Sequence, residues 1–426
     1  MTRSPQSVWS KTLRIHGDKY YAFSMYFLFK PSIFALLILS THSLVWAEAF
    51  YPTSFEESRQ HFVQQAHQLE KKYKGVQIVK IPISNKHGDD LSIDAVYVPQ
   101  IGGQRERLVI ITSGTHGIEA FTGAAIQSQF MESGFDMGSL HNMGFLIVHS
   151  MNPWGFHHKR RVTENNVDLN RNFSLDNKLF ETQNPGYTKL NTFLNPLDPV
   201  NATLFSEVGL FIKSLWLLVT MGRATLAQAV VGGQYKYPKG VYFGGGKHEP
   251  QVPLFQNLLK RFAHSYKSVF HIDLHTGYGE RGRLHFFSSN RFSDVVKSRI
   301  QQIFQGFTID TGDDKDFYEN SGGFTQHTVS FFTDKLVIPM VFEFGTLDSQ
   351  TTMGGFASLR NSIWENQGYL YGYVDEFSKK KVLEDYSEMF NPTDPTWREK
   401  ALKTAKESFA TFLDRFGKMS TTPGQN

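Results

Sequence analysis

Short runs of this 426-residue chain are apolar at every position and rich in β-branched residues, and no other feature constrains the fold as strongly. Residues 108–111 read Leu-Val-Ile-Ile, and residues 146–148 read Leu-Ile-Val. A strand with one face in water alternates apolar and polar side chains, so an unbroken apolar run indicates a strand buried on both faces. Such strands are typical of parallel sheets between layers of helices. The sequence therefore predicts an α/β fold with a mixed, largely parallel central sheet covered by helices on both faces.

Strand and helix patterns alternate along most of the chain. We expect strands at 76–83, 91–98, 107–112, 144–149, 269–274, 284–288 and 336–342. We expect helices at about 54–73, 119–132, 203–220, 252–267, 291–305 and 354–377. The apolar stretch at 211–219 is expected to form a buried helix or a lid packed on the core rather than a membrane contact.

The domain organisation follows from the lack of internal repeats and low-complexity linkers. Residues 48–426 are expected to form one domain, with an insert within about 174–262. The Asn-, Pro- and Gly-rich stretch at 174–200 is expected to be an irregular loop or insert.

The net charge of the chain is small and is concentrated at one end. The sequence has 44 Lys and Arg against 40 Asp and Glu, and residues 1–47 hold five of the basic residues and one of the acids. The remainder is therefore neutral and shows none of the basic bias of a nucleic-acid-binding protein. The sequence predicts no nucleic-acid partner. It also contains no cysteine, which excludes disulfides, thiol catalysis and lipoprotein attachment.

Residues 1–47 resemble an export leader. From Met25 a short basic start leads into the apolar run 33–39 and then into Val45-Trp46-Ala47, a small-residue cleavage site. Met25 is the expected start of this signal peptide, because residues 1–24 are too long and too polar for its basic region. An uncleaved anchor is the alternative, but polar residues and a proline interrupt the ~20 apolar residues that a span requires. We expect an exported protein, periplasmic or secreted, without a stable membrane span after processing.

Three predicted strands end in polar residues that suit metal binding. The first leads into His116 and Glu119, another into His275, and the last into Glu343. In open α/β sheets ligands bind beyond the carboxyl ends of the strands, where distant residues converge. Two imidazoles and one carboxylate are a common ligand set of catalytic zinc, with the fourth position left for water. Taken alone, the pair His116 and Glu119 is better explained as a loop histidine and a solvated acid.

A further motif lies between these strands. Residues 165–173 read Asn-Asn-Val-Asp-Leu-Asn-Arg-Asn-Phe, and Arg160 and Arg161 precede them. Together with the strand-end residues, in this order, the motif resembles the M14 zinc carboxypeptidase superfamily over roughly residues 55–375. The phrases at 113–119, 242–245 and 272–277 are most similar to its DUF2817 branch, which is related to succinylglutamate desuccinylase and aspartoacylase.

This resemblance implies a zinc hydrolase with one zinc ion per chain, held by His116, Glu119 and His275. It implies that Glu343 is the general base for zinc-activated water. A carboxylate near such water can accept a proton and return it as a general acid. Asp273, two residues before His275, is expected to be structural.

The resemblance assigns roles to the arginine motif as well. Arg161 would stabilise the developing oxyanion, with Arg160 as the open alternative. Asn170 and Arg171 would bind the terminal carboxylate of the substrate, a task that suits the planar guanidinium. Asp168 would orient a zinc-bound imidazole.

One departure from the superfamily concerns a tyrosine that many of its members carry shortly before the glutamate. No tyrosine lies between Tyr318 and Glu343, so Tyr318 is the candidate for this substrate-binding position. We expect a metallocarboxypeptidase-like hydrolase that cleaves a peptide or amide bond next to a free carboxylate. The alternatives are an amidohydrolase of N-acyl amino acids and a non-catalytic binding protein on the same fold.

Overall fold

The computed structural model describes residues 46–135, 137–289, 291–310 and 321–421. These described residues form one compact unit. The predicted leader, with its start at Met25, lies outside the described residues except for its end, and so does Tyr318. The export signal and the division into leader and single domain therefore stay predictions.

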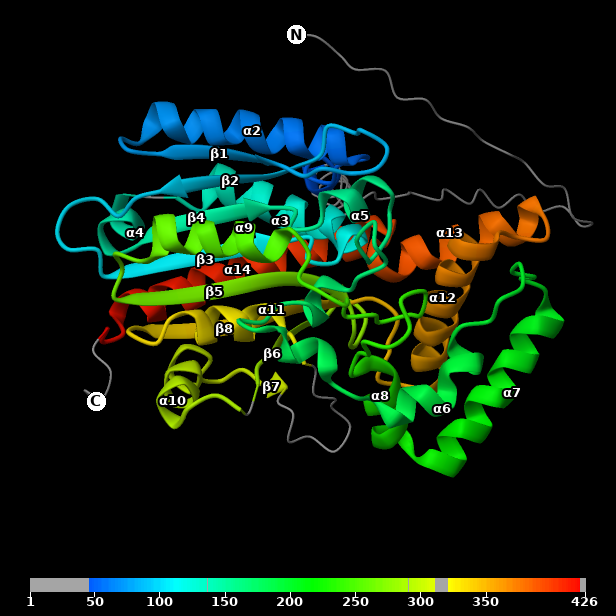
Figure 1. Ribbon diagram of the computed structural model, residues 1–426. Coiled ribbons are helices and arrows are strands. Elements are labelled where there is room, and N and C mark those ends of the chain that lie inside the picture. Colours follow the sequence, from blue (N-terminus) through cyan, green and yellow to red (C-terminus); the bar gives the residue numbers. More distant parts are fainter. Residues whose placement is uncertain (1–45, 136, 290, 311–320, 422–426) are drawn as a thin grey trace, which may run out of the picture. The chain divides into compact units, whose positions relative to one another are not determined.

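An eight-stranded sheet forms the centre of the molecule, in the order β1-β2-β4-β3-β5-β8-β6-β7 (Figure 1). The strands are β1 Gln77–Pro82, β2 Ser92–Val98, β3 Arg107–Ser113, β4 Gly144–His149, β5 Ser268–Gly277, β6 Leu284–Phe287, β7 Ile309–Asp310 and β8 Leu336–Gly345. The four central strands β4, β3, β5 and β8 are parallel. The pairs β1–β2, β2–β4 and β6–β8 are antiparallel, and β7 pairs parallel with β6. The prediction of a mixed, largely parallel sheet is confirmed.

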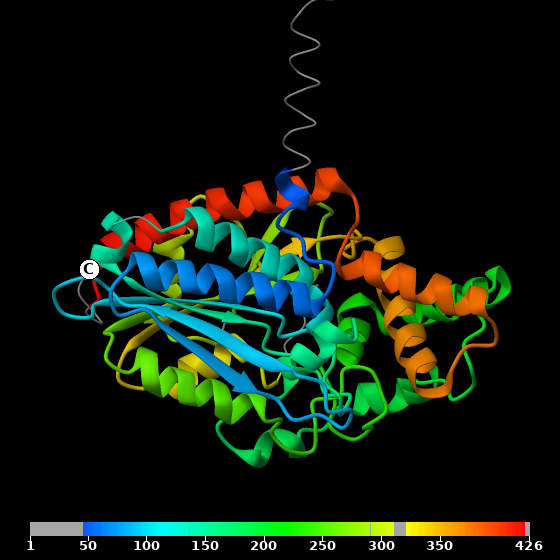
Figure 2. The same cartoon turned by 90° about the horizontal axis from the view of Figure 1, so that it is seen from above.

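Helices cover both faces of this sheet, because the side chains of each buried strand alternate between two cores. Val109 and Ile111 of β3 join a core with α2 (Phe55–Lys72), α3 (Ala120–Ser133) and α14 (Pro395–Lys418). Leu108 and Ile110 join a second core with α9 (Gln251–Leu258) and α11 (Phe324–Phe331). Figure 2 shows α14, α3 and α2 on one side of the sheet and α9 on the other.

The predicted helix at 354–377 is confirmed up to Tyr371 and wrong in its last six residues. The chain forms α12 (Thr352–Tyr371) and α13 (Glu376–Phe390) instead. Gly372 ends α12 with φ +85°, a conformation that glycine adopts readily, and the Asp375 carboxylate caps the first turn of α13. The other helices are α4 Met137–Asn142, α5 Pro153–His157, α6 Pro185–Leu194, α7 Leu204–Met221, α8 Arg223–Val231 and α10 Asp294–Ile303.

A third apolar core lies beside the sheet. Helices α6, α7 and α8 of the insert form it together with α12 and α13. The stretch at 174–200 is less irregular than expected, since Asn184 caps α6 and Pro185 occupies its first turn. Helix α7 packs Leu217 into this core, but its opposite face is exposed, with Phe205 at 89% exposure. The prediction of a buried or lid helix thus holds for one face only. Within the described ranges, α7 is also the one helix long and apolar enough to cross a membrane.

Candidate metal centre

The carboxyl ends of three neighbouring parallel strands position the predicted metal ligands. His116 and Glu119 follow β3, His116 just before the short 3-10 turn Gly117–Glu119 and Glu119 at its end, and His275 lies near the end of β5. Glu343 of β8 stands directly opposite His275 in the parallel register. The sheet topology therefore brings together residues that lie more than two hundred positions apart in sequence.

The three ligand candidates converge through two kinds of donor atom, imidazole nitrogen and carboxylate oxygen. His116 Nδ1 lies 2.8 Å from Glu119 Oε1, and His275 Nδ1 lies 2.9 Å from Glu119 Oε2. The two Nδ1 atoms are 3.2 Å apart. All three residues are buried, and their ligand atoms form a group that can hold a metal ion.

A carboxylate lies behind each imidazole. His116 Nε2 is 3.1 Å from Asp168 Oδ1, as the predicted orienting role of Asp168 requires. His275 Nε2 is 2.5 Å from Asp273 Oδ2, so the expectation that Asp273 is merely structural is wrong. The hydroxyls of Thr112 and Thr115 donate to Asp273 and fix it in place. Carboxylates behind both imidazoles are the usual support of metal-binding histidines.

This arrangement fits a cation. A histidine that donates its Nε2–H to a carboxylate keeps a lone pair on Nδ1, and here two such lone pairs face each other and Glu119. Burial alone would raise the pKa of Glu119 and lower that of His275. The mutual contact nevertheless lowers the pKa of Glu119 strongly, and Asp273 together with Glu119 raises that of His275 well above its ordinary value. A positive charge is therefore stabilised in this site, and its two nitrogens and one carboxylate are donors that suit zinc.

Close backbone packing brings Arg161 to the site. An added Cβ on Gly117 would lie 2.1 Å from the carbonyl carbon of Gly155, so the two segments approach this closely only because residue 117 is a glycine. The Gly117 N–H donates to the Arg161 carbonyl at 3.1 Å. The Arg161 guanidinium donates to Glu119 at 3.1 Å and to Asp168 at 3.2 Å. Burial opposes the charge of Asp168, but Arg161 and His116 hold its pKa well below the usual range.

Arg160, the alternative to Arg161, points away from the metal ligands. Its Nε donates to Glu365 of α12 at 2.6 Å, and its guanidinium lies 3.7 Å from the ring centre of Tyr369. The structure thus places Arg161 in the site and Arg160 in a buried ion pair with α12.

Glu343 lines the same cavity as the ligand candidates. Its Oε1 accepts a hydrogen bond from the Tyr278 N–H at 2.9 Å. Loss of solvation and the nearby Glu119 carboxylate raise the pKa of Glu343 to about 7. A carboxylate with a pKa near neutrality can both accept and return a proton.

The predicted carboxylate-binding pair separates in the structure. Asn170 lines the cavity and accepts a hydrogen bond from the Phe324 N–H with its Oδ1. Arg171 is 1% exposed, and its guanidinium donates to the carbonyls of Val231 and Asn170. Among the described residues, Arg161 and Arg223 are the arginines of the cavity wall. The direct contact of Arg171 with substrate stays a prediction.

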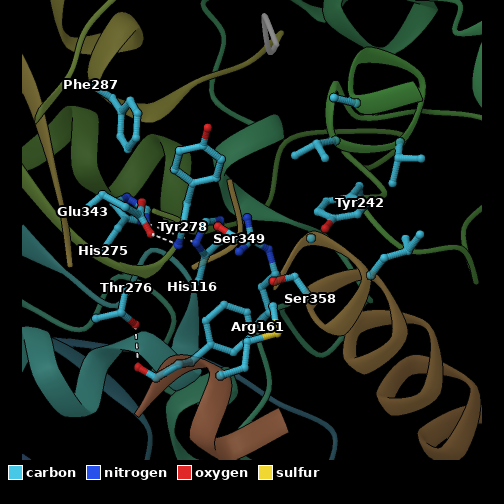
Figure 3. Close-up of a pocket in the computed structure, with 18 of the residues that line it drawn as sticks. His116, Arg161, Tyr242, His275, Thr276, Tyr278, Phe287, Glu343, Ser349 and Ser358 are labelled. Atoms are coloured by element: carbon cyan, nitrogen blue, oxygen red, sulfur yellow. Dashed lines mark hydrogen bonds between the residues drawn. The ribbon is translucent and has the colours of Figure 1, made fainter. Parts of the chain in front are cut away.

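Sequence reasoning missed two tyrosines of the cavity wall, Tyr242 and Tyr278. Tyr278 lies just beyond the end of β5, three residues after His275, and this position was an available signal. Tyr242 comes from the insert, and no local sequence pattern predicts that it lies in the cavity wall. Figure 3 shows His275 and Glu343 together, with Tyr242 on the other side of the cavity.

The cavity has a volume of about 340 Å³ and continues from the ligand candidates to the insert. This volume lies within the range of small-molecule sites. Polar residues of the strand ends form one part of its wall, and apolar residues of α7, α8 and α12 form the other.

Comparisons with known proteins place these observations in context. No curated protein matches the chain. Similar solved structures include bovine thrombin-activatable fibrinolysis inhibitor, with 14% identity over 75% of this chain and 97% of that chain and a TM-score of 0.42. Carboxypeptidase A from Helicoverpa armigera has 14% identity over 84% and 81%, with a TM-score of 0.40. A metallo-carboxypeptidase from Pseudomonas aeruginosa has 13% identity over 75% and 70%, with a TM-score of 0.38.

The sequence also matches a family described as "Protein of unknown function (DUF2817)" over residues 51–404. This match spans most of the chain and includes every metal-ligand candidate. The motif-based prediction of the branch is confirmed, and the chain belongs to the DUF2817 family.

Proposed function

We propose that the protein is a zinc-dependent, carboxypeptidase-like hydrolase that cleaves a peptide or amide bond next to a free carboxylate. The observation that carries this proposal is the convergence of His116, Glu119 and His275 with Glu343 and Arg161 on one cavity. A binding protein on the same fold would need no carboxylate placed like Glu343, with a pKa raised to about 7.

The chemistry divides between the metal and the chain. His116, Glu119 and His275 would hold one zinc ion, which supplies Lewis acidity to the amide carbonyl and to water. Glu343 takes a proton from the attacking water, whose oxygen bonds to the amide carbon. Glu343 then gives this proton to the amide nitrogen, and the carbon–nitrogen bond breaks to leave an acid and an amine.

Arg161 stabilises the negative charge that develops on the carbonyl oxygen. Its guanidinium lies in the cavity wall beside Glu119 and is held there by Asp168. A fixed positive charge in a partly buried site stabilises the transition state more than water would. Asp168 therefore has two tasks, because it also orients the His116 imidazole.

The substrate would present its carboxylate to the polar part of the cavity, near Asn170 and Arg161. Both a peptide with a free C-terminus and an N-acyl amino acid offer an amide beside such a carboxylate. The apolar wall contributed by the insert favours the N-acyl amino acid as the second candidate. We also propose that the protein is exported, on the evidence of residues 1–47 alone.

A substrate panel tests the proposed function. Purified protein with added zinc is incubated with short peptides and N-acyl amino acids, each with a free or an amidated C-terminal carboxyl group. We expect hydrolysis of the free acids and at least tenfold slower hydrolysis of the amidated forms, because the amide lacks the recognised charge. The Glu343→Gln variant should be inactive on every member. Turnover by this variant, or indifference to the carboxylate, would refute the assignment.

A further inference from the structure

The insert and helix α12 together give the cavity a long apolar wall. Leu215 and Leu218 line it from α7, Leu226 and Val230 from α8, and Phe356 and Leu359 from α12. The lining residues of α7 follow the spacing of a single helix face and extend for about 10 Å along its axis. This wall is longer than one amino-acid side chain needs.

Nine of the lining residues of α7, α8 and α12 are apolar, whereas Ser214, Arg223, Thr352 and Ser358 are polar. The Ser214 hydroxyl, which also lines the cavity, already donates to the Leu210 carbonyl within α7. Where a bound polypeptide faced the apolar side chains, it would bury backbone N–H and C=O groups without hydrogen bonds, at a cost of about 1–3 kcal/mol for each group. An aliphatic chain has no such groups and gains from contact with leucine, valine and phenylalanine side chains.

The apolar wall is continuous with the metal centre. The residues of α7, α8 and α12 belong to the same cavity as His116, Glu119 and His275. In Figure 3, Ser358 of α12 lies across the cavity from Glu343 and His275. A molecule that reaches from one part to the other therefore has a hydrolysable group at its polar end and an apolar tail.

We propose that the wall formed by α7, α8 and α12 binds a long aliphatic acyl chain, so that the substrates are N-acyl amino acids of long-chain carboxylic acids. This inference rests on the proposed function and specifies its substrate class. Hydrolysis of such a compound releases a fatty acid, which takes the hydroxyl of water, and a free amino acid, which takes the proton.

A binding experiment tests the apolar wall apart from turnover. Zinc-loaded Glu343→Gln protein is titrated by calorimetry with N-acetyl-, N-octanoyl- and N-dodecanoyl-alanine. We expect the octanoyl compound to bind at least about tenfold more tightly than the acetyl compound, since each buried methylene contributes up to about fourfold in affinity. Equal dissociation constants for the three compounds would overturn the proposal.

Two further substitutions in the Glu343→Gln protein test where the acyl chain binds. Leu218→Gln places an amide in the apolar wall and should reduce the preference for octanoyl over acetyl by about tenfold. Ala227→Phe, on α8, fills the cavity and should abolish any gain from octanoyl to dodecanoyl. Val219→Gln is the matched control, because Val219 follows Leu218 on α7 but is 77% exposed and lies outside the cavity wall. If Val219→Gln reduced the preference for octanoyl over acetyl as much as Leu218→Gln does, the acyl chain would not bind along the proposed wall.

Turnover by the wild-type protein separates the two proposals. Chain-length-dependent binding without hydrolysis of any panel member would refute the hydrolase and leave the acyl-binding wall standing. Hydrolysis of acetyl and dodecanoyl compounds at equal kcat/KM, with equal affinities, would refute the acyl-binding wall and leave the hydrolase standing.

Discussion

The side chains of the site differ in how well the sequence alone predicts their positions. His116, Glu119 and His275 follow apolar strands, and their grouping in the structure matches the predicted ligand set. Asp273 was interpreted as structural, although residues two apart on a strand share a face, and this spacing places it beside His275. Arg160 and Arg161 are adjacent and chemically identical, so the sequence alone could not distinguish them; the different partners of the two guanidinium groups do.

Substitution of the two arginines should have different main effects, on stability for Arg160 and on kcat for Arg161. Arg160→Ala breaks a buried ion pair with Glu365 and should lower the free energy of unfolding by about 3–5 kcal/mol. Arg161→Ala removes a cation from the cavity wall and should lower kcat about 100- to 1,000-fold. Urea denaturation and steady-state kinetics of both variants measure these effects. A catalytic loss confined to Arg160→Ala would reverse the assignment.

His149 predicts a pH dependence of stability. Burial beside the Phe62 ring lowers its pKa from 6.5 to about 4, and its Nε2 lies 2.8 Å from the Ser58 hydroxyl. Between pH 6.5 and 4 the unfolded chain binds a proton at this position and the native chain does not, so the free energy of unfolding falls as the pH is lowered. The part due to His149 is at most about 3 kcal/mol at pH 4.

Denaturation of wild-type and His149→Gln protein across this pH range isolates that part. The variant should lose less stability than the wild type between pH 6.5 and 4, whatever its stability at pH 8. Parallel curves for the two proteins would show that His149 does not titrate as proposed.

At the scale of elements, the strands were easier to predict than the helices of the insert. Short runs rich in apolar and β-branched residues located all the described strands except the two-residue β7. Helix α8 is short, and its sequence shows little of the helical pattern. Helix α6 does carry apolar residues at helical spacing, Tyr187, Leu190 and Leu194, but the stretch around it is rich in Asn, Pro and Gly and was predicted to be irregular. The break at Gly372 went unpredicted because a single glycine can also occur inside a helix. The close approach of the Gly117 turn to α5 depends on distant backbone atoms and leaves no local signature.

The contact between the Gly117 turn and α5 is tested by adding one methyl group. In Gly117→Ala the new Cβ collides with the Gly155 backbone, which should displace Arg161 and the ligand loop together. We expect loss of several kcal/mol of stability and at least tenfold weaker zinc binding. Gly209→Ala in α7 is the control, since no atom lies within 4 Å of its Cβ, and it should stabilise the protein by about 0.5–1 kcal/mol. Unaltered zinc affinity in Gly117→Ala would contradict this account.

The two faces of α7 should respond differently to truncation. Leu217→Ala opens a cavity in the core of the insert and should lower the free energy of unfolding by about 2–4 kcal/mol. Phe205→Ala removes a side chain that is 89% exposed and should change it by no more than about 0.5 kcal/mol. Chemical denaturation of both variants measures the difference, and a large cost for Phe205 would mean that α7 packs its outer face.

At the scale of the whole molecule, the parallel sheet and the insert have separate tasks. The sheet brings the metal-ligand candidates and Glu343 to one edge, and this part of the site was predictable because strand ends converge. The insert supplies the opposite wall of the cavity and therefore bears on the choice of substrate. This wall could not be predicted, because it depends on how α7, α8 and α12 pack on one another.

The most direct test of the central claim is the zinc content of the purified protein after dialysis, measured together with hydrolysis of the best panel substrate. We predict about one zinc per chain in the wild type, in Glu343→Gln and in the exposed-histidine control His141→Ala. His275→Ala should retain almost none, and of the four proteins only the wild type and the His141 control should hydrolyse the substrate. Full zinc occupancy in His275→Ala, or hydrolysis by Glu343→Gln, would contradict the account.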